Sequence, residues 1–302
     1  MWNVAKRFIL FFAVNLLVML AIGIVFAVLQ TFFPALRGQS MGGMLVLAAL
    51  FGFVGSFISL FMSKWLAKRG QGVKVIDPAT ATGEERWLVQ TVHKLAKQAG
   101  IEDMPEVGIW DSPEINAFCT GPSKNSSLLA VSTGLLRHMN KDEVEGVIGH
   151  ELAHAANGDM VTLTLLTGVV NTFVIFFSWI IAQALTRRSN DDEGPVGGGF
   201  AYHMLVMVLQ MVLGLLATIF VLAPFSRYRE YRADAGGAKL AGKDKMIAGL
   251  QALLDQHRVP LPQGAADPSL AAFKIDGLGG LMATHPRLED RIARLKAMVI
   301  LH

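Results

Sequence analysis

Four long apolar stretches constrain the fold of this chain more than any other feature. They are residues 8–33, 41–62, 160–185 and 200–225, and none of them contains Asp, Glu, Lys or Arg. A helix needs about 20 mostly apolar residues to cross a bilayer. The 302-residue chain is 52% hydrophobic and only 17% charged, whereas soluble domains have about 25% charged residues. We therefore expect about four transmembrane helices, with one hairpin in residues 1–63 and a second in residues 160–226.

Two alternatives to membrane spans fit the sequence less well. The first stretch could be a cleaved secretory signal, but it is longer than a typical signal segment and no Ala-x-Ala site closes it. All four stretches could be core helices of a soluble protein, but four separate runs without charge argue against this. The third and fourth stretches are the weaker pair, because they contain the polar residues Asn171, Gln183, His203 and Gln210.

The positions of lysine and arginine predict the orientation, because both are enriched on the cytoplasmic side of membrane spans. They cluster before the first stretch, after the second and after the fourth: Lys6, Arg7, Lys64, Lys68, Arg69, Lys74, Arg227, Arg229 and Arg232. Arg187 and Arg188 fall on the far side and count against this scheme. We expect both termini and the two non-membrane segments, residues 64–159 and 227–302, to be cytoplasmic, with the lipid bilayer as a partner.

Composition also excludes some partners and sites. The formal net charge of +3 is small, and basic and aromatic residues are not interleaved, so we expect no nucleic-acid partner. Cys119 is the only cysteine, which rules out an intrachain disulfide and a zinc site of the cysteine-finger type.

The non-membrane segments combine helices with short strands. Apolar residues recur at helical spacing in residues 84–98. Short apolar runs typical of strands occupy residues 107–110 and 128–131, and residues 116–120 are a third candidate. Asn140 and Glu143 form a capping box, which begins a helix. These elements predict an α+β fold with a small β-sheet.

The most informative motif is His-Glu-Leu-Ala-His at residues 150–154. Residues four apart share a face of a helix, so His150 and His154 can present ring nitrogens to one zinc ion. Glu151 lies beside the first ligand, where it can take a proton from the attacking water and pass it to the leaving amine. The motif therefore predicts zinc-dependent hydrolysis, with one zinc ion per chain.

A chance match on a solvated helix is the alternative for this motif. Its neighbours are all uncharged, namely Val147, Ile148, Leu152, Ala153, Ala155 and Ala156. A surface helix would carry more charge, and a buried helix would not hold two histidines and a glutamate without a ligand to satisfy them. The metal site is the better interpretation.

The third zinc ligand must come from elsewhere, since catalytic zinc takes three protein ligands and one open position. Asp159 follows His154 by five residues and would point away from it on a continuing helix. As many residues separate His154 from Asp192 as separate Asp192 from Glu230, so a helical hairpin turning near Asp192 returns Glu230 to the level of His154. Asp234, one turn later, can orient a ligand histidine. The alternative is that Glu230 is not a ligand, but a charged residue at the end of a membrane span that pairs with a neighbouring arginine.

Taken together, these motifs resemble the HtpX-type membrane metalloproteases, which belong to the same broad family as the Ste24-type CAAX proteases. The matching segments are residues 150–159, 226–234, 116–118 and 284–286. The resemblance implies a zincin-like fold, zinc ligation by His150, His154 and Glu230, and Glu151 as the acid–base group. It also implies a bacterial inner-membrane location and cleavage of damaged or misassembled membrane proteins under stress.

Two further segments carry weaker signals. Asn116, Ala117 and Phe118 are candidates for an edge strand that binds substrate backbone, or they form an ordinary buried strand. His285 precedes a proline, which suits a helix N-cap, whereas the resemblance makes it a stabiliser of the oxyanion. Arg291 either serves in a similar way or is solvated.

Three functions remain open at this stage. The first is an endopeptidase that acts on membrane-protein segments at the cytoplasmic surface. The second is trimming of prenylated CAAX tails, for which four spans are too few to enclose a large intramembrane chamber. The third is a membrane adaptor with structural zinc, which would not need a base at Glu151 and would normally fill all four ligand positions. The sequence favours the endopeptidase, with the zinc-motif helix in residues 64–159 and the third ligand in residues 227–302.

Overall fold

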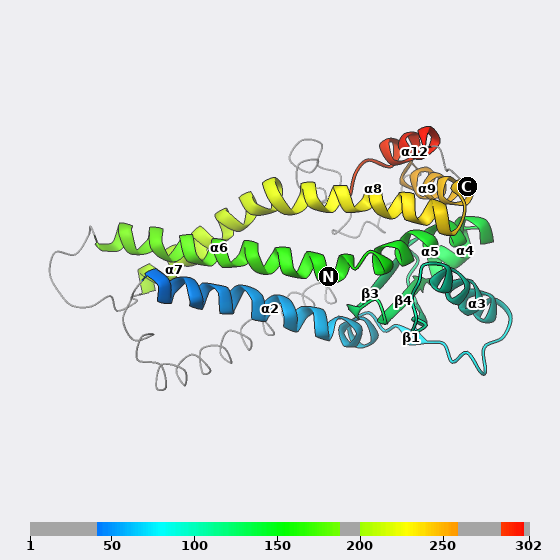
Figure 1. Cartoon of the computed structure of the whole chain (residues 1–302), viewed down its shortest axis with the longest axis horizontal. Coiled ribbons are helices and arrows are strands. Elements are labelled where there is room, and N and C mark those ends of the chain that lie inside the picture. The colour runs from blue at the N-terminus through cyan, green and yellow to red at the C-terminus, as the bar shows by residue number, and fades with distance from the viewer. Residues whose placement is uncertain (1–40, 188–199, 259–284, 299–302) are drawn as a thin grey trace. The chain divides into compact units, whose positions relative to one another are not determined.

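The computed structural model describes residues 41–187, 200–258 and 285–298. The first predicted span, residues 8–33, and the predicted turn near Asp192 lie outside the described residues. The described residues fall into two compact units. One unit comprises residues 41–59, 164–187 and 200–218, and the other comprises residues 60–163, 219–258 and 285–298. Figure 1 labels most of the elements of both units.

Long apolar helices account for the membrane part. They are α2 (Met41–Gly70), α6 (Asp159–Arg187) and α7 (Phe200–Ala217), and a π-helical turn (Thr218–Leu222) joins α7 to α8 (Ala223–Leu240). Among the described residues, three helical segments are long and apolar enough to cross a membrane: Gly42–Gly70, Asp159–Leu185 and Phe200–Leu240. Three of the four predicted spans therefore fall on helices of sufficient length.

Small residues set the packing of α2 against α6 within the first unit. A Cβ atom added at Gly52 would lie 2.7 Å from the carbonyl oxygen of Gly168 and 2.7 Å from the backbone nitrogen of Thr172. Close backbone approach at glycine is a general means of helix association in membranes, where apolar burial alone provides no driving force.

The second unit contains a small mixed sheet. Its strand order is β1 (Lys74–Val75), β2 (Glu106–Trp110), β4 (Ser126–Ser132) and β3 (Ala117–Ser123). The β2–β4 pair is parallel and the two outer pairs are antiparallel. All three predicted strands are present, which confirms a fold that combines helices with a small sheet. The third candidate lies in β3, which pairs only with β4 and forms an edge of the described sheet.

The helix that carries the zinc motif packs on this sheet. Helices α3 (Gly83–Gln98) and α5 (Lys141–Ala156) cover one face, where Leu129 and Val131 of β4 pack with Leu88 of α3 and with Ile148 and Leu152 of α5. The alternate residues of β4 face the other way, onto the end of α2. The short helix α4 (Thr133–His138) lies between β4 and α5 in the chain. The predicted capping box of Asn140 and Glu143 is confirmed, because both of its hydrogen bonds are present at the start of α5.

Helix α8 crosses α5 at small residues. A Cβ atom added at Gly237 would lie 2.9 Å from the backbone nitrogen of His150, and one added at Gly236 would lie 2.7 Å from Cβ of Ala153. Two further helices, α9 (Lys243–Arg258) and α12 (Leu288–Ala297), pack on this pair through a separate apolar cluster. The close crossing brings the side chains of α8 within reach of the motif on α5.

Substitution of Gly237 tests this crossing. Gly237→Ala places a methyl group against the backbone of α5, so we expect a loss of about 1–3 kcal/mol in the free energy of unfolding. Gly214→Ala in α7 is the control, because a Cβ atom there meets nothing within 4 Å and alanine favours helix. Thermal denaturation in detergent without added zinc measures both, and equal stability of the two variants would contradict the packing described.

Candidate active site

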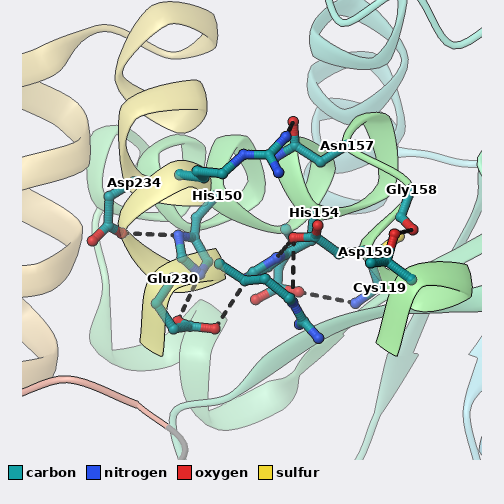
Figure 2. A network of polar contacts seen from close by, with 12 residues as sticks. Cys119, His150, His154, Asn157, Gly158, Asp159, Glu230 and Asp234 are labelled. Carbon is teal, nitrogen blue, oxygen red and sulfur yellow. Dashed lines mark hydrogen bonds and ion pairs between the residues drawn. The ribbon is translucent and has the colours of Figure 1, made fainter. Parts of the chain in front are cut away.

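Helices α5 and α8 bring three potential metal ligands together. His150 and His154 project from the same face of α5, with ring centroids 4.7 Å apart. Glu230 of α8 lies between them, with Oε1 3.2 Å from Nε2 of His154 and Oε2 3.4 Å from Nε2 of His150. One ligand atom from each of the three side chains lies within 4.8 Å of the others. Figure 2 shows Glu230 reaching toward both histidines.

The chemistry of this set fits zinc. Two imidazole nitrogens and one carboxylate oxygen are ligands that zinc prefers, and three protein ligands leave one position open, as in catalytic sites. Oε2 of Glu230 is buried beside three nitrogens, Nδ1 of His285 at 2.9 Å, Nε2 of His150 at 3.4 Å and Nη1 of Arg291 at 3.5 Å. A buried carboxylate is stable only when cations or hydrogen-bond donors surround it in this way. These observations assign the site to a zinc ion held by His150, His154 and Glu230.

A carboxylate contacts the outer nitrogen of each histidine. Oδ1 of Asp234 lies 3.0 Å from Nδ1 of His150, and Oδ2 of Asp159 lies 2.6 Å from Nδ1 of His154 (Figure 2). A carboxylate on Nδ1 fixes the tautomer and the ring orientation, so that Nε2 is left for the metal. Asp234 therefore stands where the sequence predicted an orienting group.

The position of Asp159 corrects the sequence analysis. The expectation that Asp159 points away from His154 assumed a continuous helix, and it is wrong. Helix α5 ends at Ala156, and Gly158 takes a left-handed conformation with φ of 69° before α6 begins. This turn directs the Asp159 carboxylate back to His154. A glycine just after a helix is a recognised stop signal, so Gly158 is the sequence feature that could have revealed the contact.

Nearby carboxylates stabilise a positive charge at the two histidines. Burial opposes protonation of His154, but the carboxylates of Asp159 and Glu230 outweigh burial and raise the pKa of His154 to about 9. Burial likewise opposes protonation of His150, yet Asp234 and Glu230 raise the pKa of that ring. The same negative surroundings favour a bound metal cation.

Glu151 contacts the edge strand β3. Its Oε2 accepts a hydrogen bond of 3.0 Å from the backbone N–H of Cys119 in β3 (Figure 2). Burial and the Glu151 carboxylate raise the pKa of the Cys119 thiol to about 12, so the thiol stays neutral. Cys119 thus offers its backbone, rather than a thiolate, to the site.

Residues near the C-terminus also reach the cluster. Nδ1 of His285 lies 2.9 Å from Oε2 of Glu230, while the His285 side chain is 63% exposed. The N-cap of α12 is Arg287, so the alternative that His285 caps a helix is wrong. The alternative that Arg291 is solvated is also wrong, because this side chain is buried and its guanidinium contacts Asp234.

The candidate substrate segment lies on the edge strand and just before it. Asn116 is bonded to β4, since its carbonyl accepts from the backbone N–H of Ser132 and its own N–H donates to the Ser132 hydroxyl. Ala117 and Phe118 begin β3. The segment therefore lies beside Glu151, whose partner Cys119 follows directly in the same strand.

A two-histidine, one-glutamate site on helices that continue into candidate membrane spans defines the class of the protein, a membrane zinc metallopeptidase. The chain belongs to peptidase family M48, whose family model matches residues 82–299. Zinc endopeptidase activity at His150, His154 and Glu230 follows from family and site together.

Individual relatives extend the match over almost the whole chain. The protease HtpX of Shewanella denitrificans is 54% identical over 297 residues, covering 96% of this chain and 99% of that protein. The protease HtpX of Tolumonas auensis is 51% identical over 298 residues, with 97% and 99% covered. The crystal structure of S. mikatae Ste24p has a similar fold, with a TM-score of 0.63 at 19% identity, covering 97% of this chain and 66% of that one.

Replacement of Asp159 tests its contact with the ligand histidine. Asp159→Asn removes the charge that holds Nδ1 of His154, so we expect zinc affinity to fall by about 10–100-fold. Asp142→Asn is the control, because Asp142 lies at the other end of α5 and pairs with Lys245. Competition with a chelator measures both affinities. Wild-type affinity in Asp159→Asn would show that the contact does not support the site.

Proposed function

We propose that this metalloendopeptidase cleaves membrane proteins at or near the cytoplasmic face of the bacterial inner membrane, in protein quality control under stress. One observation carries the proposal. Only Asn157 and Gly158 separate the motif helix α5 from the candidate span that starts at Asp159, and Glu230 belongs to the same continuous helical segment as the candidate span Phe200–Leu240. Peptide bonds that reach the zinc ligands must therefore come close to the membrane surface. The quality-control role rests on the resemblance to HtpX-type proteases.

The basic flanks of the candidate spans support a cytoplasmic site. Lys64, Lys68 and Arg69 end α2, and Arg227, Arg229 and Arg232 lie in α8. Such clusters are typical of the cytoplasmic side. We accordingly assign residues 64–159 and 227–302 to one cytoplasmic protease domain, and residues 1–63 and 160–226 to two membrane hairpins.

The edge strand β3 supports binding of substrate as an added strand. The Asn116 carbonyl is bonded to β4, and backbone groups alternate in direction along a strand. The N–H of Cys119 is directed away from β4, to Glu151. An extended peptide can pair with this outward edge, which is a general mode of peptide recognition. Within the segment of residues 116–118, Ala117 shares the outward register of Cys119, so its backbone is the better candidate for direct pairing.

Glu151 is the group best placed to move protons. It is not among the three ligand side chains, yet it neighbours His150 in the motif, and its carboxylate faces the edge strand where the peptide would lie. When bound, zinc supplies Lewis acidity toward the peptide carbonyl and makes a water molecule nucleophilic near neutral pH. Glu151 would accept a proton from the attacking water and deliver it to the leaving amine as the C–N bond breaks.

We propose that His285 stabilises the oxyanion. Its Nδ1 contacts Glu230, which orients the ring at the ligand cluster and leaves Nε2 directed elsewhere. When both ring nitrogens carry protons, Nδ1 donates to Glu230 and the N–H at Nε2 can stabilise the negative charge that develops on a reacting carbonyl nearby. The family resemblance implies this role for His285, and its contact with Glu230 supports the proposal.

Two glutamates should separate zinc binding from proton transfer. Glu151→Gln should retain zinc and lose about 10²–10⁴-fold in turnover of a quenched peptide, as expected for a general acid–base group. Glu230→Gln should lose both activity and zinc affinity, because a neutral amide is a poorer ligand than a carboxylate. Zinc content and cleavage are measured on the same samples. If Glu230→Gln keeps both, the third ligand lies elsewhere, and if Glu151→Gln keeps turnover, the acid–base assignment fails.

Substrate trapping tests the membrane-protein proposal directly. Glu151→Gln, which should bind but not cleave, is expected to retain membrane proteins when crosslinked in intact membranes. Recovery of soluble proteins only would contradict the proposal while leaving the peptidase activity intact.

Reporter fusions test the orientation. Fusions after Lys74 and after Arg232 should both report the cytoplasmic side, because basic residues follow both spans. A fusion in residues 34–40, between the first two apolar stretches, is the control and should report the opposite side. Opposite results for Lys74 and Arg232 would refute the shared cytoplasmic domain.

A further inference from the structure

Arg291 enters the metal centre from the C-terminal helix α12, although it is far from the motif in sequence. Its side chain is only 6% exposed. The guanidinium makes a two-pronged contact with Asp234, from Nη2 to Oδ1 at 2.6 Å and from Nε to Oδ2 at 2.9 Å. This paired geometry matches the fork of an arginine and is unavailable to a lysine.

The contact with His150 is of a different kind. Nη2 of Arg291 lies 3.3 Å from Nδ1 and 3.4 Å from Nε2 of His150, and Nδ1 also lies 3.0 Å from Oδ1 of Asp234. If Nε2 faces the metal, Nδ1 carries the proton and donates to Asp234, so it cannot accept from Arg291. The guanidinium therefore packs against the imidazole, and Asp234 is held between the two groups.

We propose that Arg291 is a positioning residue of the zinc centre. By fixing both oxygens of Asp234, it holds the ring of His150 with Nε2 toward the metal. Docking of α12 and binding of zinc are consequently coupled, so each favours the other. The inference concerns the zinc centre on which the proposed function rests, and it is independent of the substrate.

Other contacts dock α12 without touching the ligands. Ile292 and Leu295 are buried with Met246 and Leu250 of α9. The guanidinium of Arg294 lies 4.6 Å from the ring centroid of Tyr231 in α8. Arg294 is thus a matched control, because it is an arginine on the same helix that contacts α8 at a residue outside the zinc cluster.

Zinc affinity of the full-length protein in detergent, measured by competition with a chelator, tests the proposal. Arg291→Gln and Arg291→Lys should both weaken zinc by about 10–100-fold, the usual effect of losing an outer partner of a ligand. Arg294→Gln should bind zinc like the wild type. Wild-type affinity in Arg291→Lys would overturn the proposal, because lysine keeps the charge and loses only the fork.

A double-substitution cycle separates positioning from general destabilisation. If Arg291 acts through Asp234, the combination of Arg291→Lys with Asp234→Asn should lose no more zinc affinity than Asp234→Asn alone. Additive losses would overturn the proposal. The absorption spectrum of the Co²⁺-loaded protein gives a second readout, which should change in Arg291→Lys and remain unchanged in Arg294→Gln. Since neither readout uses a peptide, failure here leaves the endopeptidase proposal intact.

Discussion

Compensation of buried negative charge is the constraint on which the active site depends. Asp159, Glu230 and Asp234 are each no more than 3% exposed, and a buried carboxylate is costly unless a cation or hydrogen bonds offset it. Arg291 pairs with Asp234, and Arg229 lies 3.5 Å from Asp159. Glu230 lies 3.5 Å from Arg291 and contacts both ligand histidines, and it is the one of the three carboxylates assigned to the zinc ion. The metal therefore completes a charge balance that the protein side chains begin.

Close helix packing makes this balance possible. The carboxylates of α8 reach the histidines of α5 because the helices cross at residues without large side chains, with Gly237 against the backbone of His150. Glycine in a helix costs about 1 kcal/mol relative to alanine. That cost is offset here by the short distances between the ligands, which a wider crossing would lose.

The same helices connect the chemistry to the membrane. The motif helix is followed after two residues by a candidate span, and the helical segment that carries Glu230 contains another. The ligands are thus attached directly to apolar helices instead of to a separate soluble domain on a long linker. This attachment is the basis for proposing substrates held at the membrane surface, and it makes the orientation of the spans decisive for which compartment the enzyme serves.

Local sequence determined the elements whose causes are local. Helical periodicity, the capping box at Asn140 and the spacing of His150 and His154 predicted the motif helix, and equal chain lengths on either side of Asp192 selected Glu230. Tertiary structure alone decided the rest. The turn at Gly158 returned Asp159 to His154, strand order put β3 at an edge beside Glu151, and docking of α12 buried Arg291 against Asp234. These contacts join segments brought together only by chain reversal and packing, which periodicity along one element does not encode.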